Sequence, residues 1–351
     1  MPFEPRTVIV DRGIDQAAGA RDRIPFESDR TLEAGDRVGS PSQAIHSPIS
    51  QAIDSPISDV IDSPILEEFD RPGVSARRVE VRSSAAGRGV DRPDWVVVEE
   101  PLETRAQGPG QDPISVAVTM RTPGHDAELA VGFLHTEGLL AGRDELTAVP
   151  EPRSGRSKKL CNVITIKLNR RFDPDSLRRN FFATSSCGLC GKATLDQLLV
   201  RCPPIPAGPE VDREIIIRLP EALREAQRVF DRTGGLHAAG LFDLKGRLIA
   251  LREDVGRHNA VDKIVGRGLL DGATPLSRHI LLVSGRIGFE IVQKAAVAGI
   301  PILCAVSAPT SLSVETANKV GMTLVGFLRG DSFNVYTHYD RIIGLSQEVV
   351  I

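Results

Sequence analysis

Between residues 237 and 336, short apolar runs alternate with amphipathic segments of helical period, and this alternation limits the fold more than any other feature. The expected strands are 237–244, 247–251, 280–283, 301–306, 322–327 and 333–336. The expected helices are 219–232, 256–270, 289–298 and 312–320. Strands that alternate with helices of about ten residues imply βαβ crossovers. We therefore predict an α/β domain over residues 206–345, built as a three-layer α/β/α sandwich.

Upstream of a Pro-rich boundary at residues 203–206, the pattern is less regular. Apolar and β-branched residues predict strands at 95–98, 114–118 and 161–168. One amphipathic segment, 126–140, predicts a helix that ends before a glycine. These elements indicate an N-terminal β-rich α+β subdomain over residues 76–205.

The first 75 residues differ from the rest of the chain. Ser-Pro-Ile recurs there at an eight-residue interval, beginning at Ser47, Ser55 and Ser63. Ser-Pro interrupts both helix and strand, and this interval matches none of the repeat lengths of solenoid proteins. We predict that residues 1–75 form a disordered tail, with a partner-binding segment as the alternative.

Charge and composition exclude several classes of protein. The net charge of −3 gives no electrostatic basis for binding nucleic acid. No apolar run approaches the roughly 18 residues of a membrane-spanning helix, and the N-terminus lacks the apolar core of a signal peptide. Five cysteines in 351 residues are too few for a disulfide scaffold, and their odd number is typical of a reducing compartment. We expect a soluble, cytoplasmic protein that binds neither nucleic acid nor membrane.

Two cysteines, Cys187 and Cys190, form a C-x-x-C pair in a loop of small residues at 184–192. Two glycines in this loop free the backbone from side-chain restraint, so we expect the loop to be mobile. A short helix predicted at 192–199 places its N-terminus close to Cys190. Unsatisfied N–H groups at that terminus, together with the charge of Lys192, favour a thiolate. The loop is therefore suited to exposed, reactive sulfur.

Four kinds of chemistry compete for this cysteine pair. A structural zinc site needs two more ligands, which Cys161 and Cys202 could supply, but there is no second C-x-x-C and Cys304 lies in a predicted buried strand. A zinc deaminase needs H-x-E before P-C-x-x-C; residues 135–137 are His-Thr-Glu, but a serine replaces the proline. A thioredoxin-type dithiol would follow the first strand of a βαβ unit, whereas here an Arg-rich segment precedes the pair. The fourth possibility is a transfer cysteine on a mobile loop.

Three polar stretches of the α/β domain follow predicted strands and precede predicted helices. Functional residues of α/β proteins often lie at such positions, because strand ends and helix N-termini meet there. In the first stretch, we expect Asp254 to cap a helix and His258 to hydrogen bond with Asp262, four residues on. The second, 284–288, has anion-binding geometry but matches no phosphate-loop motif. The third, 307–311, either lines a pocket or caps a helix.

Residues 181–192, Phe-Phe-Ala-Thr-Ser-Ser-Cys-Gly-Leu-Cys-Gly-Lys, resemble the cysteine loop of the FdhD family of formate dehydrogenase accessory sulfurtransferases. The resemblance covers roughly residues 77–343 and continues through 253–263, 283–290, 305–311 and 326–338. It implies a cytidine-deaminase-like fold, without deaminase zinc chemistry, for the C-terminal domain.

The resemblance also implies a sulfur relay. Cys187 would accept persulfide sulfur from a cysteine desulfurase, with Cys190 as an assisting thiol. The sulfur would pass to the molybdenum cofactor, bis-molybdopterin guanine dinucleotide, before that cofactor enters formate dehydrogenase. Members of the family act as homodimers. The segment that matches the family's cofactor-binding residues comprises Phe327, Leu328, Arg329, Gly330, Asp331 and Ser332.

The sequence assigns no metal ligands, and the alternative function is a zinc-stabilised nucleotide-binding module without transfer activity. We expect the C-terminal domain to bind a guanine nucleotide, as a fragment of the cofactor that it would receive. Arg286 and Arg329 can make forked contacts to phosphate. Phe327 and Phe333 could form a wall for the base, unless both are core residues of a hairpin.

Overall fold

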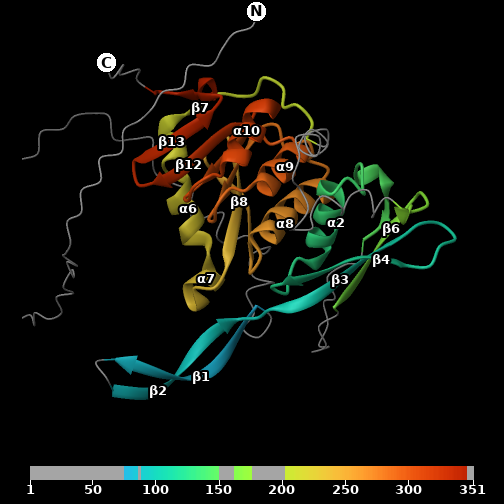
Figure 1. Cartoon of the computed structure of the whole chain (residues 1–351), viewed down its shortest axis with the longest axis horizontal. Coiled ribbons are helices and arrows are strands. Elements are labelled where there is room, and N and C mark those ends of the chain that lie inside the picture. The colour runs from blue at the N-terminus through green and yellow to red at the C-terminus, as the bar shows by residue number, and fades with distance from the viewer. Residues whose placement is uncertain (1–74, 86–87, 150–161, 176–201, 346–351) are drawn as a thin grey trace, which may run out of the picture. The chain divides into compact units, whose positions relative to one another are not determined.

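The computed structural model describes residues 75–85, 88–149, 162–175 and 202–345, all within one compact unit of the chain, Pro56–Ile351 (Figure 1). The predicted tail, apart from its last residue, and the predicted cysteine loop at 184–192 lie outside the described residues. None of the described helices is long and apolar enough to cross a membrane.

A six-stranded mixed sheet forms the centre of the C-terminal region. Its strand order is β13-β12-β11-β10-β8-β9; β10, β11 and β12 are parallel, and the other strands run antiparallel to their neighbours. The strands are β8 (His237–Asp243), β9 (Leu248–Asp254), β10 (His279–Val283), β11 (Ile302–Ala305), β12 (Thr323–Arg329) and β13 (Ser332–Thr337). The six strands predicted from the apolar pattern are confirmed to within a few residues at their ends.

Helices cover both faces of this sheet (Figure 1). One face carries α8 (Arg257–Leu270), α9 (Phe289–Val297) and α10 (Ser311–Val320). The other carries α5 (Arg213–Ile216), α6 (Leu219–Ala226) and the short parallel pair β7 (Val211–Asp212) and β14 (Ile342–Ile343). Because side chains alternate along a strand, Leu281 packs with the first group and Leu282 with the second. The region has the predicted three layers, and its likeness to a cytidine deaminase stays a prediction.

The prediction of one helix over 219–232 is wrong, because Gln227 interrupts it and α7 (Arg228–Thr233) begins a new helix. Gln227 has φ −80° and ψ 68°, outside the helical region. The carboxylate of Glu253, at the end of β9, accepts hydrogen bonds from two N–H groups in the first turn of α7, at 3.3 and 3.0 Å. This contact from a distant strand stabilises the start of α7.

A second sheet, of order β4-β3-β6-β5, packs against helix α2 (Asp126–Thr136). Its strands are β3 (Glu100–Gln107), β4 (Ile114–Arg121), β5 (Leu146–Ala148) and β6 (Val163–Leu168). Single 3-10 turns lie at Arg143–Glu145 and Tyr339–Arg341. The predicted strands at β4 and β6 are confirmed, whereas β3 was missed because charged residues occupy its half-exposed face. Helix α2 is shorter than the predicted 126–140, since Gly138, at φ 71°, turns the chain.

A separate two-stranded hairpin precedes this sheet. Strands β1 (Ala76–Ala85) and β2 (Arg88–Val97) pair in an unbroken antiparallel register, from Ala76 opposite Val97 to Ala85 opposite Arg88. Helix α7 lies against β2, close to Val97. The sequence predicted only the end of β2, because charged residues interrupt the apolar alternation elsewhere in the hairpin.

Helices α2 and α8 cross at a contact that two glycines permit, and we call this crossing the helix junction. A Cβ atom at Gly132 would lie 1.8 Å from the backbone oxygen of Asp262. A Cβ atom at Gly266 would lie 1.9 Å from the backbone oxygen of Glu128. No side chain fits at such distances, so the two helices touch backbone to backbone.

Buried ion pairs flank the helix junction. Lys294 Nζ, on α9, lies 2.9 Å from Asp262 Oδ1 and 3.2 Å from Glu137 Oε1, and it donates to Thr136 Oγ1 at 2.9 Å. Burial lowers the pKa of Lys294, but the carboxylates of Asp262 and Glu137 outweigh that effect and hold the pKa above its usual value. The predicted hydrogen bond between His258 and Asp262 is therefore wrong, because Asp262 is turned towards Lys294.

One short sequence signal acquires a structural role at this junction. The His-Thr-Glu triplet at 135–137 supplies two of the groups that hold Lys294. On the other side of the junction, Arg252 makes a two-pronged ion pair with Glu128, with Nη2 2.7 Å from Oε1. The N-terminal and C-terminal regions are thus joined by close backbone contact and by satisfied buried charges.

Candidate functional site

The loops after β10, β11 and β12 meet at the C-terminal ends of these strands, as expected because the three strands are parallel. We call them together the loop ledge, which comprises residues 284–288, 306–310 and 326–332. Ile287 N–H donates to Ala308 O at 3.1 Å. Phe327 N–H donates to Ser307 O, also at 3.1 Å. Backbone hydrogen bonds therefore join the three loops into one surface.

The predicted cofactor-binding segment, residues 327–332, ends β12, turns, and begins β13. A bulge between Gly326 and Arg329 interrupts the strand pairing there. Phe327 has φ 53° and exposes 42% of its surface, whereas Leu328 is fully buried. A bulky residue at positive φ costs of the order of 1 kcal/mol or more, and such strain is concentrated at functional sites. Phe327 is thus not a core residue, while Phe333 packs against the core.

Two arginines of the loop ledge are exposed to solvent. Arg329 Nε donates to Val306 O at 3.0 Å, which fixes its stem against the second loop. Arg286 makes no hydrogen bond or ion pair with any residue that the structure describes. Its guanidinium is available for an anionic ligand, and guanidinium is the side-chain group best suited to forked phosphate contacts.

The N-termini of α9 and α10 differ in how their N–H groups are satisfied. Thr310 and Ser313 form a capping box at α10, with Ser313 Oγ accepting from Thr310 N–H at 2.9 Å. This settles the role of residues 307–311 in favour of capping. Gly288 starts α9 without a side-chain cap, and a Cβ atom at this position would have no heavy atom within 4 Å apart from its chain neighbours. Of the two loops, residues 284–288 are therefore the ones suited to bind an anion, through the N–H groups at the start of α9.

A cluster of charged and titratable groups that the sequence did not connect lies beside the loop ledge. His258 Nε2 lies 2.9 Å from Glu290 Oε2, and this contact holds the pKa of Glu290 below its usual value. Burial, helped by the nearby charges of Arg257 and His258, lowers the pKa of His237, so its imidazole is neutral at pH 7. Arg257 Nε is buried and has no hydrogen-bond partner among the described residues. His237 and Glu290 escaped notice because they lie 53 positions apart on a strand and a helix without a shared motif.

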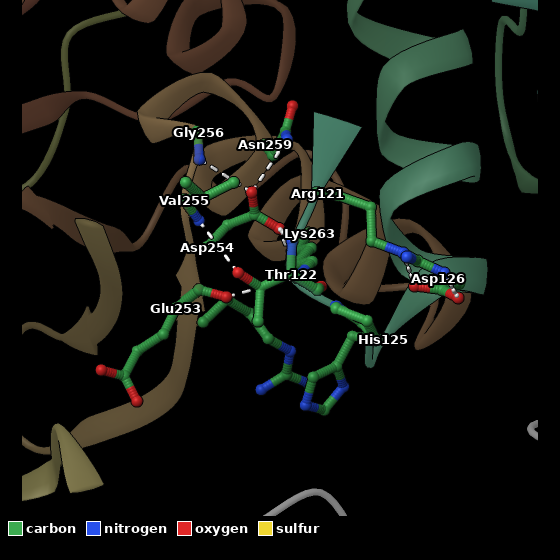
Figure 2. A network of polar contacts seen from close by, with 12 residues as sticks. Arg121, Thr122, His125, Asp126, Glu253, Asp254, Val255, Gly256, Asn259 and Lys263 are labelled. Carbon is green, nitrogen blue, oxygen red and sulfur yellow. Dashed lines mark hydrogen bonds and ion pairs between the residues drawn. The ribbon is translucent and has the colours of Figure 1, made fainter. Parts of the chain in front are cut away.

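A buried network around Asp254 holds the start of α8 in place (Figure 2). Asp254 pairs with Lys263 at 2.7 Å, and its other oxygen accepts from Gly256 N–H and from Asn259 Nδ2, each at 2.8 Å. Thr122 N–H also donates to Asp254, at 3.2 Å, which ties the network to the end of β4. The predicted N-cap role of Asp254 is wrong, because Gly256 occupies that position. Asp254 instead braces the loop before the helix.

The cysteines divide into two groups. Cys187 and Cys190 lie outside the described residues, as does Cys161. Cys202 and Cys304 are buried, and burial raises the pKa of the Cys202 thiol to about 11 and that of Cys304 still higher. Both thiols are neutral at pH 7 and therefore poor nucleophiles. Within the described ranges, no group of three or more His, Cys, Asp or Glu side chains is arranged to hold a metal ion.

Together, these groups suit a ligand that is both anionic and aromatic. Arg286, Arg329 and the uncapped start of α9 supply positive potential. Phe327 supplies an exposed ring, and base–aromatic stacking is worth about 1–3 kcal/mol per base. Neutral His237 and the His258–Glu290 pair can donate hydrogen bonds to, and accept them from, polar atoms of a ligand nearby.

Comparison with known proteins gives a family and several close relatives. The sequence model of the FdhD/NarQ family matches residues 97–343. A protein of Streptomyces coelicolor named sulfur carrier protein FdhD is 49% identical over 282 residues, which cover 77% of this chain and 96% of that protein. A protein of the same name from Sulfurisphaera tokodaii is 49% identical, and the match covers 71% of this chain and 92% of that protein. Another from Mycobacterium tuberculosis is 46% identical, and the match covers 77% of this chain and 99% of that protein.

One solved structure is similar in fold. It is the crystal structure of a candidate formate dehydrogenase accessory protein from Desulfotalea psychrophila, with a TM-score of 0.60. The match covers 77% of this chain and 100% of that chain, at 24% sequence identity. At that identity the likeness concerns the fold alone.

Proposed function

Because the chain belongs to the FdhD/NarQ family, we propose that it is a sulfur carrier, a sulfurtransferase that serves formate dehydrogenase in the cytoplasm. Identity of 46–49% to proteins named sulfur carrier protein FdhD, over nearly their whole length, carries this proposal. A cysteine desulfurase donates the sulfur, and the carrier acts as a homodimer.

Sulfur is loaded by an exchange at Cys187. Its thiolate attacks the outer sulfur of a persulfide on the desulfurase, the sulfur–sulfur bond of the donor breaks, and the donor leaves as a thiolate. Cys187 then holds the persulfide, and the step involves no net oxidation. The buried, neutral thiols of Cys202 and Cys304 are unsuited to this attack, which favours the C-x-x-C pair.

Sulfur is released with the help of Cys190. Its thiolate attacks the inner sulfur of the Cys187 persulfide, and the outer sulfur leaves as hydrosulfide for the molybdenum of bis-molybdopterin guanine dinucleotide, the substrate. The two thiols supply the two electrons that reduce the outer sulfur, and a Cys187–Cys190 disulfide remains. A cellular dithiol reduces this disulfide before the next cycle.

The loop ledge holds the guanine nucleotide part of that substrate. The exposed ring of Phe327 and the arginines Arg286 and Arg329 support this assignment, as does the uncapped start of α9. Leu328 supports the segment from the core and does not face the ligand. The nucleotide would anchor the substrate while the cysteine loop delivers sulfur.

Intact-mass measurement tests the loading step. After incubation with a cysteine desulfurase and free cysteine, the protein should gain the mass of one sulfur atom, and a reductant should remove it. Cys187→Ala should abolish the gain, while Cys304→Ala, which changes a buried thiol, should retain it. A full gain in Cys187→Ala would contradict the proposal. One zinc per chain, lost on substitution of Cys187 and Cys190, would instead support the zinc-stabilised nucleotide-binding module.

A further inference from the structure

The hairpin β1–β2 has two chemically different faces. Residues opposite one another in an antiparallel pair share a face, as do alternate residues along a strand. The unbroken register therefore places the following residues on one face, which we call the valine face: Arg77, Val79, Val81, Ser83, Arg88, Val90, Arg92, Asp94 and Val96. The other face, which we call the polar face, carries Arg78, Glu80, Arg82, Asp91 and Trp95.

The valine face is open in the single chain. Val90 and Val96 expose 60% and 41% of their surface, and Val79 and Val81 are half-buried. A two-stranded hairpin without a packed face is only marginally stable in water. These valines therefore indicate a surface that another molecule covers.

The two faces also differ in how their charges are paired. On the polar face, Arg78 lies 4.0 Å from Glu80, and Arg82 lies 3.9 Å from Asp91. On the valine face, Arg92 and Asp94 make no ion pair with any described residue. Asp94 accepts one hydrogen bond, from the neighbouring N–H of Trp95. The valine face thus combines exposed apolar groups with charges of both signs on β2, namely Arg88 and Arg92 against Asp94, and none of the three makes an ion pair with a described residue.

The order of these groups along β2 is self-complementary. Successive residues on this face are Val90, Arg92, Asp94 and Val96. A two-fold axis through the level of the Glu80–Pro93 pair places Arg92 over the second copy's Asp94, and Val90 over the second copy's Val96.

The same axis also matches the residues of β1. It places Val79 over the second copy's Val81 and Arg77 over the second copy's Ser83. No like charges meet, and every large apolar side chain of the face meets another. A contact of this kind requires the same patch on both molecules, which is the property of a two-fold dimer.

We propose that the valine face packs against the valine face of a second copy of this chain. This gives the homodimer of the proposed function a defined contact surface and rests on a different observation from the sulfur transfer.

Charge reversal on the full chain tests the contact. Arg92→Asp places two carboxylates against each other at each of two symmetry-related positions, and Asp94→Arg does the same with two guanidinium groups. Each single variant should raise the dimer dissociation constant about tenfold or more, measured by analytical ultracentrifugation at low salt. The double variant Arg92→Asp/Asp94→Arg restores opposite charges and should return to within about threefold of the wild type. The loss in the single variants should shrink at 1 M salt, because salt screens exposed charges.

Two controls separate the contact from the folding of the hairpin. Arg82→Asp makes the same charge change on the polar face and should leave the dimer unchanged. Trp95 is the single tryptophan of the chain and lies on β2, so its fluorescence reports whether the hairpin is intact in each variant. A wild-type protein that stays monomeric at all concentrations would overturn the proposal. It would do so even if a different protein covers the valine face. A dimer that both single variants leave intact would also overturn it. Sulfur loading on Cys187, measured by mass, is independent of these outcomes.

Discussion

The helix junction and the loop ledge contain similar polar residues, but these residues are buried and paired at the helix junction and exposed at the loop ledge. At the helix junction, Lys294 lies within 3.2 Å of three partners and Glu128 is paired twice with Arg252. At the loop ledge, Arg286 is exposed and unpaired among the described residues, and Phe327 is held outward at positive φ. Charged groups whose hydrogen bonds and ion pairs are all formed within the protein stabilise the fold. Polar groups left without protein partners at the end of a parallel sheet are those that bind a ligand.

The physical reason is the cost of burial. A charge buried without a partner costs several kcal/mol, so the helix junction can hold charges only by satisfying each of them. Water satisfies the exposed groups of the loop ledge, and a ligand can replace that water. Substitutions should therefore change stability at the helix junction and change binding at the loop ledge.

The largest effect is expected from Gly266→Ala. Its Cβ would lie 1.9 Å from the backbone oxygen of Glu128, so the helices must separate, and we expect a loss of at least about 3 kcal/mol in unfolding free energy. The melting temperature should fall by roughly 6–12 °C. The matched control is Gly288→Ala at the loop ledge, where open space should limit the loss to less than about 1 kcal/mol. Equal losses in the two variants would remove the distinction between the regions.

A smaller effect is expected from acid at Glu128. Burial raises the pKa of this carboxyl, but hydrogen bonds from Arg252 and His125 outweigh it and lower the pKa from 4.5 to about 2. A folded-state pKa below the unfolded value contributes stability that is present above pH 4.5 and is lost as the pH falls towards 2. At about 1.4 kcal/mol per pH unit this amounts to about 3 kcal/mol.

Denaturant unfolding of wild type and Glu128→Gln, from pH 7 to pH 3, measures this contribution. The variant should be less stable by about 3 kcal/mol at pH 7, and the difference should narrow as the pH falls below 4.5. Arg247→Gln, which breaks an exposed ion pair with Asp243, is the control and should cost less than about 1 kcal/mol. A difference that does not depend on pH would show that the Arg252–Glu128 pair is not ionised as described.

The smallest effect on stability is expected from ligand binding at the loop ledge. Ligand at about 100 times its dissociation constant stabilises a protein by about 2.7 kcal/mol. GDP should therefore raise the melting temperature by about 5–10 °C, and ADP should raise it distinctly less. Arg286→Ala should reduce the shift without changing the melting temperature of the free protein. Arg278→Ala, an exposed arginine just before β10, is the control and should leave the shift intact.

The nucleotide comparison also sharpens the contrast between the regions. Equal shifts with GDP and ADP would reduce the loop ledge to a phosphate site. No shift with GDP at millimolar concentration would remove the assignment of residues 327–332, while the stability results at the helix junction would stand.

The fold of the C-terminal region was largely predictable from its sequence. The strand that contains Cys304 and the helix before Gly321 match the structure, because their apolar residues repeat with the period of the element. The hairpin β1–β2 was mostly missed, since its charged residues hide the alternation. The site was predictable only in part: the sequence pointed to Arg286 and to residues 327–332 but not to His237 or Glu290.

The sequence by itself determined the elements, because side-chain spacing along one segment reports the hydrogen-bond pattern of that segment. It also determined the family, since the matched residues extend through most of the chain. Tertiary structure alone decided the partners of the polar groups. Asp262 binds Lys294, 32 residues away, rather than its neighbour His258, and Gly132 meets α8 across more than a hundred residues. Such contacts depend on how whole helices pack, and the local spacing of residues carries no record of that packing.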